Sequence, residues 1–162
     1  MRRSLAISIL VALGMMGHSM TALGKSTSGK DLLNAVTAKD VDPAQIQAIL
    51  SRGADIDARD EAGRTALLIA THGNRIEVAR VLIEDGADVN AKDRINDSPY
   101  LYTGPRGHLE ILKMTLTHGA DLKSTNRYGG TALIPASERG HVDTVRTLIE
   151  AGVDVGHVNN LG

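Results

Sequence analysis

A period of 33 residues limits the possible folds of this chain more than any other feature of its sequence. The hydroxyl residues Thr65, Ser98 and Thr131 are 33 positions apart, and each is followed by Ala-Leu or Pro-Tyr. A second series of Gly-Ala-Asp or Gly-Val-Asp triplets has the same period and begins at Gly53, Gly86, Gly119 and Gly152. A fixed period of this length predicts a solenoid, in which each structural unit packs mainly on its two neighbours.

Each period is predicted to contain two short helices joined by a tight turn. The turn column holds Asn74, Gly107 and Gly140, which are residue types that accept a left-handed backbone. The second helix carries apolar residues at positions i, i+3 and i+7, a spacing that predicts one buried face. These residues are Ile76, Ala79 and Ile83 in one unit, Leu109, Leu112 and Leu116 in the next, and Val142, Val145 and Ile149 in the last.

Aliphatic residues must form most of the core, because the chain has no Phe, no Trp and only 3 Tyr. Tyr100 shares a column with Leu67 and Leu133 and is predicted to fill the core. For Tyr102 two predictions stay open, a place in the core or a hydroxyl directed into a groove. The absence of cysteine excludes disulfides, cysteine nucleophiles and zinc sites built on cysteine.

The unit at residues 60–92 holds the most complete set of motif residues: Asp60, Gly63, Thr65, Leu67, Ala70, Glu77, Val78, Leu82, Gly86, Ala87, Asp88, Val89, Asn90 and Ala91. This series resembles the repeat pattern of the ankyrin repeat family, and the resemblance extends over about residues 31–162. It implies an all-α fold, an ankyrin repeat solenoid of stacked helix-turn-helix units with connecting β-turns. The chain departs from the family where Leu68, Leu101 and Ile134 replace the histidine of the Thr-Pro-Leu-His motif. A polar bridge that is usual in the family is therefore missing.

The period also predicts the domain organisation. Repeats are expected at about 31–59, 60–92, 93–125 and 126–158, with the start of a further repeat at 159–162. The first repeat is degenerate before Gln45 and is expected to form an N-terminal capping unit. The last full repeat has no polar cap, so the array is expected to be incomplete and to expose part of its apolar set. That set is Ile134, Val142, Val145 and Ile149.

Residues 1–24 have the pattern of a secretory signal peptide. Met-Arg-Arg at residues 1–3 precedes a mostly apolar run at residues 5–16, and Ala-Leu-Gly at residues 22–24 offers a small-residue cleavage site. Cleavage after Gly24 predicts a linker at residues 25–30 and a periplasmic or secreted protein that is not attached to a membrane. The alternative is a buried N-terminal helix. Because the leader holds two basic and no acidic residues, its removal changes the formal net charge from −1 to −3, which does not favour nucleic acid as a partner.

The sequence shows no pattern that predicts catalysis or metal binding. His108 and His141 share one column, and equivalent atoms of stacked units lie roughly 10 Å apart, whereas zinc ligands must approach to about 2 Å. The resemblance implies that a histidine in this column hydrogen-bonds to loop backbone. The recurring aspartates are predicted to complete turns after the second helices; they are Asp55, Asp88, Asp121 and Asp154. We therefore expect no cofactor, no metal and no enzymatic activity.

The concave side of the predicted stack is the expected binding surface, because partners of solenoid proteins usually dock there. The residues whose columns in the family pattern place them there are Arg64, His72, Lys92, Arg94, Ile95, Asp97, Arg106, Arg127, Tyr128 and Arg139. Arginine and tyrosine are common in interface hot spots, and the positive charge of this set contrasts with the acidic mature chain. These residues predict that the chain binds another protein through an acidic surface of that protein.

The resemblance extends to exported bacterial ankyrin repeat proteins and implies support of a periplasmic enzyme or neutralisation of a toxin. The sequence does not choose between these two roles. One alternative is the binding of a small anion such as a phosphosugar, although the sequence does not indicate an apolar pocket for it. A truncated array without independent function is another alternative, and the oligomeric state is left open.

If residues 1–24 are a signal peptide, the exported protein begins at Lys25. Mass spectrometry of the N-terminus of the protein recovered from producing cells measures this directly. A chain that still begins at Met1, or that stays in the membrane fraction, would contradict the prediction.

Overall fold

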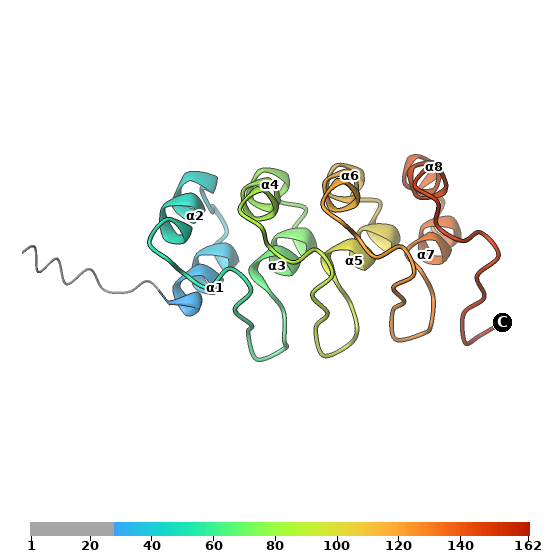
Figure 1. Cartoon of the computed structure of the whole chain (residues 1–162), viewed down its shortest axis with the longest axis horizontal. Helices are drawn as coiled ribbons and strands as arrows, with labels where there is room; N and C mark the ends of the chain where they lie inside the picture. The colour runs from blue at the N-terminus through green and yellow to red at the C-terminus, as the bar shows by residue number, and fades with distance from the viewer. Residues whose placement is uncertain (1–27) are drawn as a thin grey trace, which may run out of the picture.

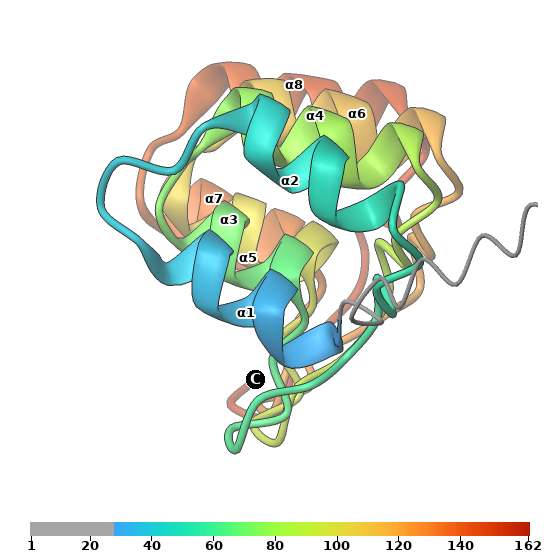
Figure 2. The ribbon, with the colours of Figure 1, turned by 90° about the vertical axis from the view of Figure 1, so that its left-hand side faces the viewer.

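Four helix pairs stand in a row in the computed structural model, which describes residues 28–162 (Figure 1). The eight helices are α1 (Gly29–Thr37), α2 (Pro43–Leu50), α3 (Ala66–His72), α4 (Ile76–Glu84), α5 (Pro99–Arg106), α6 (Leu109–Thr117), α7 (Leu133–Glu138) and α8 (Val142–Glu150). The odd-numbered helices form one layer, the even-numbered helices form a second, and the long loops project from the stack beyond the first layer (Figure 2). No strand occurs in this part of the chain. The predicted all-α stack of helix-turn-helix units is confirmed.

The first helix begins earlier than the predicted linker allows. The Ser28 backbone N–H donates to the Asp31 carboxylate at 2.8 Å, which forms a capping box and starts α1 at Gly29. The linker predicted at residues 25–30 is therefore wrong at its C-terminal end. The predicted signal peptide at residues 1–24 lies outside the described residues and stays a prediction.

The turn inside each helix pair has the left-handed backbone that its residue types predict. Asn74, Gly107 and Gly140 have φ angles of 49°, 65° and 71°. A β-branched residue would be strained at these positions, whereas glycine and asparagine tolerate them. This turn lets the second helix fold back against the first, so the prediction from the column is confirmed.

Contacts between neighbouring units form the core. α3 packs on α1 and α5, and α4 packs on α2 and α6. The largest fully buried side chains include Leu67, Leu82, Leu148 and Tyr100. Tyr100 lies in the same repeat column as Leu67. The prediction that Tyr100 fills the core is confirmed, because none of its surface is exposed. Burial raises the pKa of its hydroxyl to about 12.

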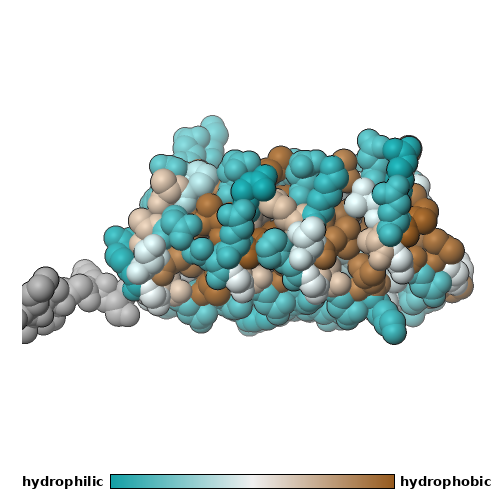
Figure 3. Space-filling view, turned by 45° about the horizontal axis from the view of Figure 1, so that its top comes forward, coloured by the Kyte–Doolittle hydropathy of each residue, from teal (hydrophilic) through white to brown (hydrophobic). Residues whose placement is uncertain are grey.

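The predicted apolar face of the second helices is buried only in part. On α8, Val142 and Ile149 are 65% and 49% exposed, whereas Ala79 and Ile83 on α4 are buried. α4 is packed between α2 and α6, but α8 contacts α6 on one side and no further helix in residues 28–162 on the other. Apolar surface is correspondingly visible at the α8 end of the stack (Figure 3).

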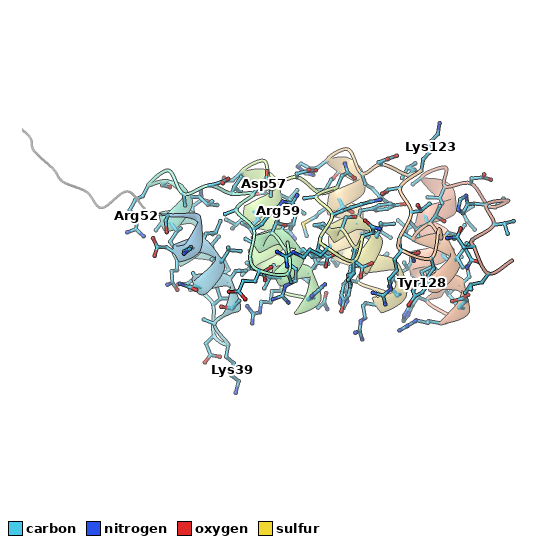
Figure 4. All side chains as sticks on the ribbon, turned by 90° about the horizontal axis from the view of Figure 1, so that it is seen from below. Lys39, Arg52, Asp57, Arg59, Lys123 and Tyr128 are labelled. Carbon is cyan, nitrogen blue, oxygen red and sulfur yellow. The ribbon has the colours of Figure 1, made fainter. Side chains whose placement is uncertain are left out.

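Hydrogen bonds between equivalent loops join successive units. The Arg59 guanidinium donates to the carbonyl of Lys92 at 2.6 Å, and the Lys92 ammonium donates to the carbonyl of Thr125 at 2.9 Å. In the same way, the Asp57 carboxylate accepts the backbone N–H of Asp88 at 3.1 Å. Asp57 and Arg59 lie next to each other at the base of one loop (Figure 4). These bonds fix the spacing of the loops, which the candidate site depends on.

Amides of α8 should exchange with solvent faster than amides of α4. Helix α8 is covered on one side only and opens at lower free energy, so we expect protection factors lower by at least about tenfold. Hydrogen exchange followed by mass spectrometry measures both helices in one sample. Equal protection of the two helices would contradict this account of the packing.

Gly104→Ala should destabilise the stack by roughly 1–3 kcal/mol. A Cβ atom at this position would overlap the carbonyl oxygen of Ala132, where α5 meets the start of α7. Urea denaturation measures the free energy of unfolding. The control is Gly156→Ala, because its Cβ would lie at an ordinary 3.4 Å from the Asp154 carboxylate, so a change under about 0.5 kcal/mol is expected. Equal effects of the two variants would rule out close packing as the reason for Gly104.

Candidate functional site

A surface pocket of about 400 Å³ lies between the third and fourth units. Its walls are the C-terminal half of α5, the helix α7 and the loop tip at residues 126–130, with contributions from residue 97 and from the C-terminal segment. The lining residues are Asp97, Tyr102, Pro105, Arg106, Asn126, Arg127, Tyr128, Gly130, Ile134, Pro135, Glu138, Arg139, Asn159 and Leu161. We call this site the unit 3/4 pocket.

The loop tip that forms one wall is rigidly built. The Asn126 side-chain oxygen accepts backbone N–H groups of Tyr128 at 2.9 Å and of Gly130 at 3.1 Å. The Asn126 N–H itself donates to the Gly130 carbonyl at 2.9 Å, which closes the turn. Asparagine and aspartate favour such turns because their short side chains reach the backbone two residues ahead. These bonds close the turn that carries Arg127 and Tyr128, which both line the pocket.

Two of the arginines of the pocket are held against tyrosine rings. The Arg106 Nε donates to the Tyr102 hydroxyl at 3.0 Å, and its guanidinium carbon lies 5.4 Å from the Tyr102 ring centre. The guanidinium carbon of Arg127 lies 4.8 Å from the ring centre of Tyr128. Cations over aromatic faces are attracted by the ring quadrupole. The two guanidinium groups are thus positioned before any ligand binds.

The remaining lining is partly acidic and partly apolar. Asp97 is half-buried, and burial raises the pKa of its carboxyl group, with Asp93 adding to the shift and Arg127 opposing it. Ile134 and Pro135 on α7 form apolar surface inside the pocket, and Leu161 is 80% exposed beside them. The site therefore combines positive charge with an apolar wall, which the sequence did not indicate.

Five of the predicted binding residues line this pocket. They are Asp97, Arg106, Arg127, Tyr128 and Arg139. The predicted residues Arg94 and Ile95 lie outside it on the exposed loop tip at residues 93–97, where Ile95 is 46% exposed.

The other three predicted residues make contacts within the stack. Arg64 forms an ion pair with Asp60 at 2.7 Å, and the Lys92 ammonium donates to the carbonyl of Thr125. The ring of His72 lies against the ring of Tyr102, with ring centres 4.0 Å apart and ring planes tilted by 39°. These three side chains have partners within the stack and do not line the pocket.

Sequence reasoning missed the apolar members of the site. The sequence leaves two predictions open for Tyr102; in the structure it is half-buried and lines the pocket, its hydroxyl accepts from Arg106, and its ring lies against His72. Ile134 occupies the column where the family has histidine, and this substitution was the available signal for an apolar pocket wall. Leu161 shares the 33-residue column of Ile95 and Tyr128, and this period was the available signal for it.

Two histidines lie next to Tyr102, which lines the pocket. The Nε2 atoms of His72 and His108 are buried without a hydrogen-bond partner in the described residues, and Tyr102 lies between their rings. Burial lowers the pKa of both histidines. For His72, the charges of Arg64 and Arg106 lower the pKa further, and the charge of Asp93 opposes this shift. For His108, the charges of Arg106 and His141 lower the pKa further.

His141 behaves as the resemblance implies for its column. Its Nε2 lies 3.2 Å from the carbonyl oxygen of Pro105, which ties the fourth unit to the end of α5. Arg75, in the same column, donates in the same way to the carbonyl of Val36. His108 shares the column but makes no such bond in the described residues. Its predicted role is therefore wrong, and this is the place where the third unit differs from its neighbours.

The recurring aspartates complete turns as predicted. Asp55, Asp88, Asp121 and Asp154 each accept the backbone N–H of the residue two positions ahead, at 2.8 to 3.1 Å.

In residues 28–162 no group of three or more histidine, aspartate or glutamate side chains is placed to hold a metal ion. Each helix that the structure describes is too short or too polar to cross a bilayer.

Comparisons with known proteins agree with this architecture. A family model for ankyrin repeats (3 copies) matches residues 7–93 and 95–159. The crystal structure of an ankyrin repeat domain from Acinetobacter baumannii AYE is 66% identical in sequence, with a TM-score of 0.76, over 81% of this chain and 65% of that chain. The crystal structure of the ankyrin repeat protein EF0377 is 46% identical, with a TM-score of 0.76, over 81% of this chain and 66% of that one. This chain thus spans about two thirds of the length of both, and no curated protein matches it.

His72→Phe should reduce the loss of stability that occurs on acidification. The native state favours the neutral form of His72. The stability that the neutral ring contributes is therefore present above the unfolded pKa of 6.5 and is lost as the pH falls below it. Phenylalanine keeps the ring contact with Tyr102 but cannot take up a proton. Urea denaturation at about pH 7.5 and pH 5.5 measures the change in the free energy of unfolding. The control is His118→Gln at an exposed position, and equal pH dependence in all three proteins would contradict the prediction.

Proposed function

The chain belongs to the ankyrin repeat family, and we propose that it binds another protein through the unit 3/4 pocket and the loop tips beside it. Ankyrin repeats mediate protein–protein interaction and are typically binding modules without enzymatic activity. The observation that carries the proposal is the gathering of Arg106, Arg127 and Arg139 around one pocket with an apolar wall. Aromatic and arginine side chains around a partly desolvated pocket are typical of interface hot spots.

The proposed partner has an acidic surface. None of the three arginines has an ion-pair partner in residues 28–162, although Asp97 and Glu138 line the same pocket. Carboxylates of a partner can form paired hydrogen bonds with a guanidinium group, which gives both geometry and affinity. Positive charge at the rim also increases the rate of association with an acidic protein.

Export is a separate part of the proposal and rests on the signal-peptide pattern of residues 1–24. In that setting the partner is a periplasmic or secreted protein. The two roles that the family resemblance implies, support of a periplasmic enzyme and neutralisation of a toxin, both need a surface of this kind. Identification of the captured partner distinguishes them.

A second candidate is the binding of a small anion. It is favoured by the volume of the pocket, about 400 Å³, which lies in the range of small-molecule sites, and by the apolar wall beside the arginines. Calorimetric titration with inorganic phosphate tests this candidate directly. Micromolar binding that Arg127→Glu abolishes would favour it over a protein partner.

The triple variant Arg106→Glu, Arg127→Glu and Arg139→Glu should lose its partner while it keeps its fold. We expect recovery of the partner to fall by at least about tenfold, because charge reversal opposes both encounter and binding. The measurement is affinity capture from the exported proteins of the producing organism, followed by mass spectrometry. Circular dichroism checks the helix content of the variant.

A matched control reverses three charges outside the pocket: Lys39→Glu, Arg52→Glu and Lys123→Glu. These exposed side chains lie away from Tyr128 (Figure 4) and give the same change in net charge. The control should capture the partner as the natural chain does. If both triple variants lose the partner equally, or if both still capture it, a role for the pocket is contradicted. Added salt should weaken capture by the natural chain.

A further inference from the structure

The charges of the unit 3/4 pocket are arranged for a ligand with more than one carboxylate. In residues 28–162, four basic side chains form ion pairs with an acidic residue three or four positions away, among them Arg64 with Asp60 and Arg146 with Asp143. The arginines of the pocket come instead from three different segments, the end of α5, the tip at residues 126–130 and the end of α7. A single carboxylate cannot pair with all three of them at once in bidentate geometry.

Two of these guanidinium groups are held in place before binding. Arg106 contacts Tyr102, and Arg127 contacts Tyr128. These contacts already restrict the rotamers of both arginines, whereas an arginine without such contacts would lose that freedom only on binding. Pre-positioned groups lose less conformational entropy when a ligand arrives. The pocket therefore favours a ligand whose carboxylates are spaced to meet both groups.

The apolar wall favours a ligand that carries an apolar group as well as charge. Ile134, Pro135 and Leu161 line the same pocket as the arginines, and an apolar group of a ligand can cover part of the exposed surface of Leu161. Burial of apolar area contributes about 25 cal/mol per Å², so an aliphatic side chain in this position adds to the affinity. A volume of about 400 Å³ has room for one or two side chains but not for a helix, whose diameter is about 10–12 Å.

We propose that the unit 3/4 pocket binds a short extended segment of the partner protein, in which one aliphatic side chain is flanked by Asp or Glu residues. The aliphatic side chain contacts Ile134 and Leu161, and the flanking carboxylates pair with Arg106 and Arg127. This inference rests on the proposed function and specifies the chemistry of the segment that the partner presents.

Selection from a phage-displayed library of random peptides, about 12 residues long, tests the inference on the full chain. The expected result is enrichment of sequences with Leu, Ile, Val or Met between acidic residues. A synthetic copy of one enriched peptide should bind at least about tenfold more weakly to Arg127→Glu and to Leu161→Ser, both at exposed positions. The control Lys123→Glu should bind it as the natural chain does.

Changes in the peptide provide the second half of the test. Replacement of its aliphatic residue by Gly, or of its acidic residues by Asn and Gln, should each weaken binding by about tenfold. Enrichment of sequences without acidic residues, binding that is insensitive to Leu161→Ser, or no enrichment at all would overturn the inference. The proposed function is contradicted by a different result, namely that the arginine triple variant captures the partner as well as the natural chain does.

Discussion

Packing between neighbouring units is the constraint on which the rest of this structure depends. A single helix pair cannot bury its apolar side chains, because it consists of only two short helices. The neighbouring helix pairs complete the core. Side chains such as Arg59 and Lys92 add hydrogen bonds from one loop to the next. These contacts bring side chains from different units together at defined positions.

The same packing requirement divides the polar residues of the loops into two groups. Arg64 and Lys92 are used to stabilise loops, and His72 packs under Tyr102, so these residues contribute to the shape of the surface. Arg106 and Arg127 are held on tyrosine rings and keep most of their N–H groups available. The proposed binding site therefore lies between the third and fourth units, where close contact of Gly104 with Ala132 brings α5 and α7 together.

Much of the candidate site could be predicted from the sequence, because a repeat column implies a position in the stack. Arg106, Arg127 and Arg139 were assigned to one surface from their columns, and the structure places all three around one pocket. The apolar wall could not be predicted in the same way. Whether Ile134 is covered by a neighbour or lines a pocket depends on the loop and the chain end that approach it, and a column does not contain that information.

The sequence by itself determined the architecture, since a 33-residue period with glycine or asparagine at its turns is compatible with few folds. It also determined that Tyr100 replaces leucine in the core. Only the tertiary structure decided which polar side chains have partners inside the stack and which line the unit 3/4 pocket. Pairs such as Arg59 with Lys92, and the joint pocket of residues 97, 127 and 161, connect residues 30 or more positions apart. Distances between such residues arise from the packing of whole units, which local sequence patterns do not encode.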